Sequence, residues 1–262
     1  MEKIFVIKIG GNVLDDPESL GSFLRRFAGL TGPRILIHGG GKIASRIGDQ
    51  LGIQSQYVDG RRITDEKTRD LVTMVYGGLV NKQIVAVLQS LGCNAMGLTG
   101  ADGNVISAVK RPFKEIDYGF VGDVKAEDVN ASWLRSLLQA GVTPVFAPLT
   151  HADGVMLNTN ADTIAAVLAV ALSRYYRVRL VYCFEKKGVL RDINDPGSVI
   201  RHLPRRLYGE LLKENALADG ILPKLENAYA AIAAGVTEVL IGEAGDLTKN
   251  TGEKTEGTLI TE

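Results

Sequence analysis

The sequence is poor in the residues that most often serve as metal ligands, catalytic bases or covalent cross-links. Its 262 residues include 3 histidines, 2 cysteines and 1 tryptophan. Cys93 and Cys183 lie in apolar, strand-like runs without metal-ligand spacing, so we expect buried thiols in a reducing compartment and no disulfide framework. The histidines form no Ser-His-Asp pattern and no metal cluster. His38, at the end of an apolar run, is expected to be a structural hydrogen-bonding residue.

The chain also lacks an excess of charge of either sign, with 30 Lys+Arg against 30 Asp+Glu. Binding to nucleic acid or to an acidic membrane surface usually needs a basic excess. The first residues, Met1-Glu2-Lys3, lead into an apolar run without a signal-peptide pattern. The longest unbroken apolar stretch, 164–172, is far shorter than the roughly 20 residues that span a bilayer. We therefore expect a soluble cytoplasmic protein with neither a nucleic-acid nor a membrane partner.

Short apolar runs alternate with amphipathic helical patterns along most of the chain. Asp16-Pro17-Glu18 gives an N-cap, a proline at the first helical position and an acid in the first turn. A long helical pattern covers 64–91, loosened by Gly77-Gly78. The alternation predicts right-handed βαβ units, and hence a three-layer α/β/α sandwich around an open, mainly parallel sheet. Residues 100–126 depart from it, because glycine-separated short runs predict a β-hairpin flap over one end of the sheet.

With 45% hydrophobic residues, the chain can form one core near the upper size limit for a single domain. We expect one domain over 1–262, with an N-terminal lobe (1–175) and a C-terminal lobe (176–262).

Two glycine-rich turns follow apolar runs directly: Lys8-Ile9-Gly10-Gly11 and His38-Gly39-Gly40-Gly41. Glycine has no Cβ, so an anion can approach the backbone N–H groups closely. Both turns fall at the carboxyl ends of parallel strands, where ligand sites of such sheets lie. The pair of turns suggests a phosphate site. Lys8, taken alone, suits a phosphate contact and a solvated surface lysine equally well.

The second turn does not meet the P-loop pattern, because Leu36 replaces the first glycine and Ile43 follows Lys42. It does match the dinucleotide fingerprint formally, as Gly39-x-Gly41-x-x-Ala44 with Asp59 further on. A dinucleotide oxidoreductase, and a tight turn without any ligand, are therefore alternatives at this point.

Polar residues follow three other apolar runs. Asn160 and Asp162 suit the N-cap and first turn of an alanine-rich helix, which leaves Asn158 free to bind a carboxylate. Lys224 lies in the first turn of a helix, the unfavourable end for a cation. Of the adjacent Arg61 and Arg62, one can be structural and the other a bidentate clamp on a carboxylate.

Together these segments resemble the amino acid kinase family, and its N-acetylglutamate kinase branch in particular, from Lys8 to about Thr261. The resemblance rests on Lys8-Ile9-Gly10-Gly11, His38-Gly39-Gly40-Gly41, Asp59-Gly60-Arg61-Arg62-Ile63-Thr64, Asn81-Lys82, Leu157-Asn158-Thr159-Asn160-Ala161-Asp162 and Asp219-Gly220-Ile221-Leu222-Pro223-Lys224. It implies transfer of the γ-phosphoryl group of ATP to the side-chain carboxylate of an N-acylglutamate. A carboxylate with a pKa of about 4.3 is ionised at neutral pH and needs no general base, which agrees with the lack of a catalytic histidine.

The resemblance also implies roles for individual residues. Lys8 and Lys224 stabilise the transferring phosphoryl group, and Asp162 orients both lysines. Phosphate and substrate groups are held by Gly10, Gly11, Gly40, Gly41, Arg62 (rather than Arg61) and Asn158. The adenine nucleotide lies near Phe184, Glu185, Gly188, Val189, Leu190, Ala216, Leu217 and Ala218. Mg²⁺ is held by the phosphates of ATP, without direct protein ligands.

Two departures from the family pattern bear on these expectations. Phe184-Glu185-Lys186-Lys187-Gly188 stands where the family commonly shows Asp-Val-x-Gly. The extra N-terminal helix of the arginine-inhibited hexameric members does not precede the first apolar run, so we expect a homodimer. The acyl group stays open between acetyl, the family default, and succinyl, and the flap is expected to shape its pocket. Another activity of the same family, or a non-catalytic sensor, remains an alternative.

Overall fold

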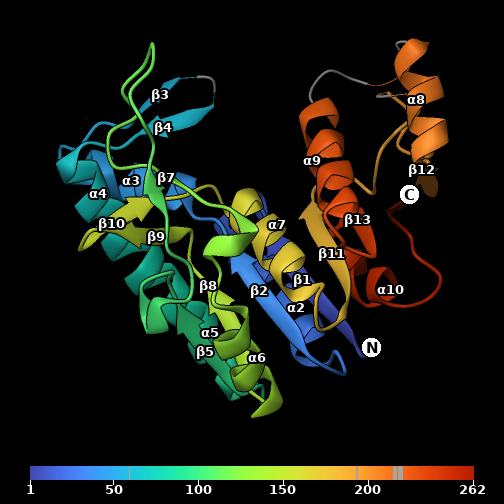
Figure 1. Ribbon diagram of the computed structural model, residues 1–262, viewed down its shortest axis with the longest axis horizontal. Coiled ribbons are helices and arrows are strands. Elements are labelled where there is room, and N and C mark those ends of the chain that lie inside the picture. The colour runs from blue at the N-terminus through green and yellow to red at the C-terminus, as the bar shows by residue number, and fades with distance from the viewer. Residues whose placement is uncertain (59, 193, 215–216, 218–220) are drawn as a thin grey trace.

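The computed structural model describes residues 1–58, 60–192, 194–214, 217 and 221–262. At its centre is an eight-stranded sheet of order β12-β14-β13-β11-β1-β2-β8-β5 (Figure 1). All neighbouring strands are parallel except β13 and β14. The strands are β1 (Lys3–Ile9), β2 (Arg34–His38), β5 (Ala95–Leu98), β8 (Thr143–Phe146), β11 (Arg177–Phe184), β12 (His202–Pro204), β13 (Glu238–Glu243) and β14 (Thr258–Thr261). The prediction of an open, mainly parallel sheet is confirmed.

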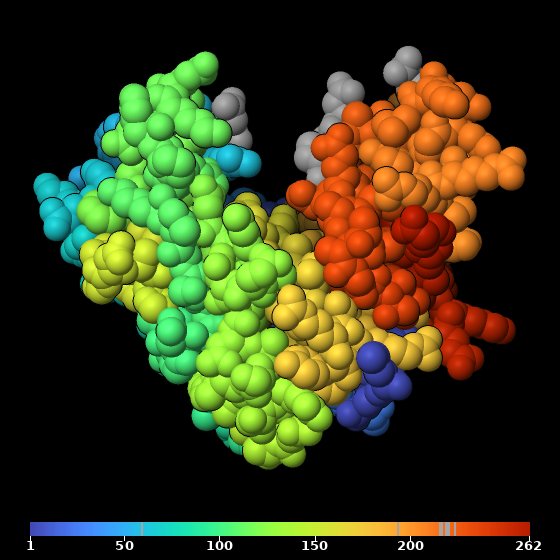
Figure 2. Space-filling model, in the orientation of Figure 1, coloured from blue at the N-terminus to red at the C-terminus, as the bar shows by residue number. Residues whose placement is uncertain are grey.

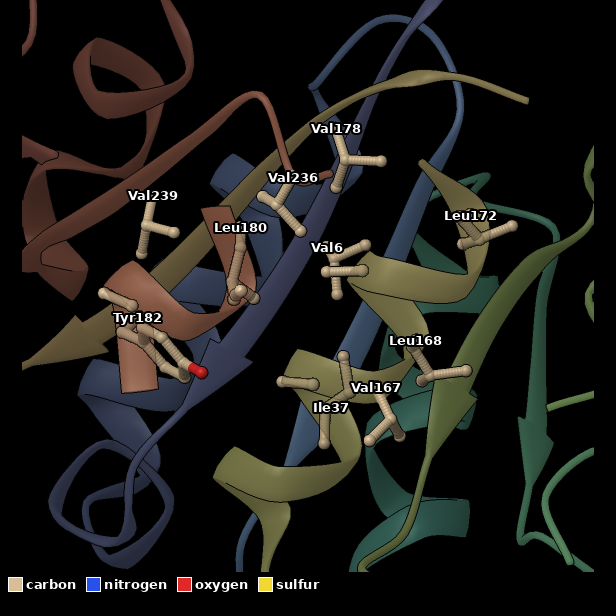
Figure 3. Packing of buried hydrophobic residues seen from close by; sticks show 14 of the residues in the cluster. Val6, Ile37, Val167, Leu168, Leu172, Val178, Leu180, Tyr182, Val236 and Val239 are labelled. Atoms are coloured by element: carbon tan, nitrogen blue, oxygen red, sulfur yellow. The ribbon is translucent and has the colours of Figure 1, made fainter. Parts of the chain in front are cut away.

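Strand β1 shows why the sheet is covered on both faces. Its side chains alternate between two cores: Ile4 and Val6 join one hydrophobic cluster, and Ile7 and Ile9 join the other. A strand buried on both faces reads as a continuous apolar run, as this one does. Figure 3 shows the first cluster, in which Val6 packs with residues of β11 and α7 (Ala161–Leu172).

Two helix layers supply the rest of these cores, which confirms the predicted three-layer sandwich. The cluster of Ile7 and Ile9 includes residues of α1 (Gly11–Asp15), α2 (Pro17–Ala28), α3 (Gly41–Gln50), α4 (Glu66–Val72), the π-helix η1 (Thr73–Val80), α5 (Asn81–Ser90) and α10 (Leu247–Thr251). The cluster of Ile4 and Val6 includes residues of α6 (Ala131–Gln139), α7, α8 (Arg205–Lys213) and α9 (Leu222–Ala233). Short 3-10 helices complete the connections: η2 (Asp102–Asn104), η3 (Ala126–Asp128) and η5 (Ala244–Asp246).

The helical stretch Glu66–Ser90 is continuous but not uniform, because its middle third is the π-helix that contains Gly77 and Gly78. By length and composition alone it is apolar enough to cross a membrane, and 44% of its apolar window is buried inside the molecule. Leu71, Ile84 and Leu88 of this stretch lie in the core. Its apolar character therefore reflects packing against the sheet, as in a core helix.

Three antiparallel hairpins stand at the carboxyl end of the sheet, on one side of an open cleft (Figures 1 and 2). They are β3 (Gln56–Val58) with β4 (Arg61–Ile63), the flap strands β6 (Val109–Lys110) with β7 (Gly122–Asp123), and β9 (Leu149–Ala152) with β10 (Val155–Asn158). The flap is a hairpin, as predicted, with only two residues paired on each strand. Strand β4, which follows Gly60 and pairs with β3, was not predicted from the sequence.

Candidate active site

A cavity of about 460 Å³ opens into the cleft at the carboxyl ends of β1 and β2. It collects residues from eight separate stretches of the chain, and these include the predicted substrate-binding residues Gly40, Gly41, Arg62 and Asn158. Its lining comprises Gly39, Gly40, Gly41, Tyr57, Gly60, Arg61, Arg62, Tyr76, Arg111, Val121, Pro148, Asn158, Thr159, Asn160, Ala161, Asp162, Thr163, Lys224 and Asn227.

Asp162, which lines the cavity, forms an ion pair with Lys8. Lys8 lies near the end of β1 and is 9% exposed, and its Nζ is 2.8 Å from Oδ1 of Asp162. Asp162 is held in the first turn of α7, where Asn160 caps the helix by accepting from the N–H groups of Asp162 and Thr163. The helix dipole favours a negative charge there. The largely buried ammonium group is thus neutralised by a carboxylate that the helix itself stabilises.

Lys224 approaches the same place from α9, far away in the sequence. Its Nζ lies 4.0 Å from the centre of the Phe184 ring, and Nζ of Lys8 lies 5.6 Å from that centre. Burial lowers the pKa of Lys224; the positive charge of Lys8 also lowers it, and Asp162 and Glu185 oppose the change. The two predicted lysines therefore approach the same aromatic ring, and the charge of Lys8 acts on Lys224.

The turn Gly39-Gly40-Gly41 forms the adjacent wall and begins α3. Gly40 has φ of +149°, and a Cβ there would lie 2.9 Å from Cδ1 of Tyr76. Tyr76 belongs to the π-helix η1, a kind of irregularity that is frequent at functional sites. Glycine is thus required at this position by both the backbone angle and the close approach of an aromatic ring.

A buried hydrogen-bond chain supports this turn from below. His38 is fully buried; its Nδ1–H donates to the carbonyl of Gly39 (2.6 Å), and its Nε2 accepts from Nδ2 of Asn81 (3.2 Å). Asn81 donates also to the carbonyl of Val145 (2.9 Å). Burial lowers the pKa of His38 to about 4, so the ring is neutral at physiological pH. This is the structural role expected from the sequence.

Arg62 is fixed at the same wall with 6% exposure. Its Nη2 donates to the carbonyl of Gly41 (2.8 Å) and to Oγ of Ser45 (3.0 Å), while Nη1 donates to Oγ of Ser55. The guanidinium carbon lies 4.8 Å from the centre of the Tyr57 ring. The neighbouring Arg61 also lines the cavity and is exposed. The sequence motif identified the arginine but not the partners that orient it.

Asn158 ends β10 and joins two hairpins at the cavity. Its N–H donates to the carbonyl of Phe120 in the flap (2.9 Å), and its Nδ2 donates to Oγ1 of Thr64 after β4 (3.0 Å). The flap contributes Arg111, whose Nε and Nη2 donate to Asp123 at 2.6–3.3 Å. Arg111 lines the cavity as well, and no sequence pattern had singled it out.

Some predicted residues lie elsewhere. Lys8, Gly10 and Gly11, all within the described part of the chain, do not line this cavity, although Lys8 contacts Asp162, which does. Phe184 and Glu185 border a second cavity of about 370 Å³, between α2 and the ends of β11 and β13. Among the described residues, no group of three or more His, Cys, Asp or Glu side chains could hold a metal ion.

The predicted nucleotide loop is only partly described. Val189 is buried and its N–H donates to Oγ1 of Thr258 (2.8 Å). A Cβ on Gly188 would lie 2.6 Å from the same oxygen. Leu190 is bridged to Val199, and Leu217 packs in the core. Ala216 and Ala218 lie outside the described residues. The nucleotide contacts stay a prediction.

The chain belongs to the amino acid kinase family, because residues 3–243 match the model of that family. Within it, the chain is 56% identical to an acetylglutamate kinase of Cytophaga hutchinsonii over 263 residues, covering 99% of each chain. It is also 56% identical to an acetylglutamate kinase of Bacteroides thetaiotaomicron, covering 97% of this chain and 98% of the relative. The family resemblance predicted from the motifs is confirmed.

Solved structures support the same fold. The N-acetylglutamate synthase of Neisseria gonorrhoeae, complexed with coenzyme A and N-acetyl-glutamate, superposes with a TM-score of 0.82 at 23% identity, covering all of this chain and 59% of that one. The carbamate kinase of Giardia lamblia bound to AMP-PNP gives a TM-score of 0.71 at 14% identity, covering 100% and 98%. At these identities the likeness concerns the fold alone.

Proposed function

We propose that the protein is an acetylglutamate kinase, which transfers the γ-phosphoryl group of ATP to the side-chain carboxylate of N-acetyl-L-glutamate in arginine biosynthesis. One observation carries the proposal. In a chain that matches acetylglutamate kinases over nearly its full length, Asp162 and Lys224 line one cavity with Arg62 and Asn158, and Lys8 is ion-paired to Asp162.

The cavity suits an anionic amino acid. Arg62 offers a planar guanidinium group, and Asn158 offers an amide, for the α-carboxylate and the adjacent groups of the substrate. The N–H groups of Gly40 and Gly41 lie at a helix start, which favours a negatively charged oxygen. These residues would bind and align the acceptor, and alignment is a large part of what phosphoryl transfer needs from a protein.

The two lysines suit the charge that develops during transfer. The acceptor carboxylate is ionised at neutral pH, so the reaction needs no base to activate it. Ammonium groups of Lys8 and Lys224 on either side of the transferring phosphoryl group would stabilise its oxygens, and Asp162 would hold Lys8 in place. Mg²⁺ bound to ATP would neutralise further phosphate charge. The protein residues assigned to the nucleotide are those of the 184–190 segment and residues 216–218.

The test is ADP release with purified protein, ATP and Mg²⁺, against a panel of acceptors. N-acetyl-L-glutamate should give the highest kcat/KM, compared with N-succinyl-L-glutamate, L-glutamate, carbamate and uridylate. Lys8→Met and Lys224→Met should each lower kcat by a larger factor than they change KM. Lys249→Met, on the surface of α10, is the matched control and should behave like the wild type.

The panel also separates the alternatives. Preference for N-succinyl-L-glutamate would replace the acyl assignment but keep the reaction. Activity on another acceptor would assign a different kinase of this family. Nucleotide binding without ADP release would identify a sensor, and binding of NAD in place of ATP would support the oxidoreductase reading of the Gly39 turn.

We further propose a cytoplasmic homodimer, with lobes divided near residue 175. Large apolar side chains are exposed along Glu66–Ser90, directly after it and on the edge strand β5: Met74, Leu79, Val87, Leu91 and Met96. In the described sheet β5 pairs only with β8, so its other edge is available for pairing with a second copy. Light scattering should give twice the chain mass, and Val87→Glu combined with Met74→Glu should give the monomer mass.

A further inference from the structure

A contact with the nucleotide does not by itself explain why Phe184 lies beside both Lys8 and Lys224. It ends β11 and stacks on Tyr182, with ring centres 6.2 Å apart. The ammonium groups of both Lys8 and Lys224 approach its ring, at 5.6 and 4.0 Å from the centre. Phe184 also stands in the segment where the sequence departs from the family pattern.

The charged groups near Lys224 stabilise its ammonium form only in part, and an aromatic ring can stabilise it further. The groups that act on its ammonium are Asp162 on α7, Lys8 on β1 and Glu185 just after β11. Asp162 is already bound to Lys8 at 2.8 Å, so its charge is shared. Burial and Lys8 both disfavour the charged form of Lys224. The negative face of an aromatic ring favours it, and this effect is larger where water is excluded.

We propose that Phe184 is a positioning residue that holds the Lys224 ammonium group in its charged form beside the Lys8–Asp162 pair. This inference rests on the proposed function, in which Lys224 acts on the phosphoryl group. Phe184 then acts on the two lysines, in addition to its place in the proposed nucleotide segment.

The experiment compares Phe184→Leu with Phe184→Tyr and Phe184→Trp. Leucine keeps an apolar side chain but removes the ring, whereas tyrosine and tryptophan keep the negative face. Phe184→Leu should lower kcat about fivefold and move the alkaline limb of kcat about half a pH unit lower, because neutral Lys224 appears sooner. The aromatic variants should recover most of both effects.

Phe5→Leu is the matched control. Phe5 lies on β1 at the opposite end of the sheet, with Nζ of Lys3 5.4 Å from its ring centre. Phe5→Leu removes the same ring from one lysine–phenylalanine contact that lies away from the cavity. It should change thermal stability without moving the pH profile of kcat.

A second measurement does not depend on activity. In the protein without substrates, the pH dependence of the rate at which an amine-reactive reagent labels Lys224, read by mass spectrometry, reports its pKa. Phe184→Leu should lower that pKa. If it does not, or if Phe184→Leu raises only the KM for ATP, Phe184 does not hold the lysine. If Phe184→Leu lowers that pKa but the wild type releases no ADP, the proposed function fails while the role of Phe184 stands.

Discussion

The 2.8 Å ion pair between Lys8 and Asp162 joins the central strand of the sheet to the first turn of α7. A lysine that is 9% exposed needs such a partner, because burying an unpaired charge is costly. This ion pair therefore contributes both to the stability of the fold and to the proposed reaction. The same carboxylate that permits a buried ammonium group also directs that group towards the cavity.

Asp162→Asn should separate the charge of this residue from its place in the helix. Asparagine keeps the size and removes the charge, so Lys8 loses its neutralising partner. We expect kcat to fall by roughly 10²-fold, the order that one preorganised group supplies. Steady-state kinetics with N-acetyl-L-glutamate and ATP measure it.

Asn160→Ala is the control for this prediction. It removes the cap of α7 and should cost about 1 kcal/mol of unfolding free energy. Its kcat should fall much less than that of Asp162→Asn. Equal losses in the two variants would mean that Asp162 serves the helix and not the reaction.

Arg62→Lys should weaken binding of the acceptor. Lysine keeps the charge but cannot reproduce the planar contacts to Gly41 and Ser45 or the stacking on Tyr57. The KM for N-acetyl-L-glutamate should rise about 10- to 100-fold, with a smaller change in kcat. Arg61→Lys is the control and should change this KM little. A rise only in the KM for ATP would contradict the assignment of Arg62.

Local signals in the sequence were enough to predict the layers of the fold. Asp16 does cap α2, and its side chain accepts from the N–H of Ser19 (2.8 Å). The stretch with Gly77-Gly78 is helical throughout, and those glycines lie in its π-helical part. Such features depend on neighbours within a few residues, so they can be inferred without the tertiary structure.

Only the residues of the candidate site that stand in recognisable sequence motifs were predictable. Lys8, Arg62 and Asn158 stand in recognisable patterns, but Tyr76 and Arg111 reach the cavity from segments without any. Their positions depend on how the π-helix and the flap pack against distant strands. Pairings such as Lys224 with Phe184 are set by long-range contacts, which local propensity does not encode.

Gly40→Ala should distort the turn at this residue for two reasons, and a control variant separates them. Its φ of +149° disfavours any side chain, and a Cβ would press on Tyr76 at 2.9 Å. We expect a loss of about 1–3 kcal/mol of stability and a marked fall in kcat/KM. Gly52→Ala is the control, because φ is +72° there and nothing lies within 4 Å of the added carbon. It should lose stability through backbone strain alone, without loss of kcat/KM.

His38→Gln should change how stability depends on pH. Burial lowers the pKa of His38 from 6.5 to about 4, so between these values the unfolded chain binds more protons than the folded protein. Stability from the neutral ring is complete above about pH 6.5 and declines as the pH falls towards 4, by roughly 3 kcal/mol in total. Urea unfolding at a series of pH values should show this slope in the wild type and a flatter one in His38→Gln.

His202→Gln, an exposed control on β12, should keep the wild-type slope. A wild-type slope in His38→Gln would mean that the buried ring is not the group responsible for the acid sensitivity of the fold.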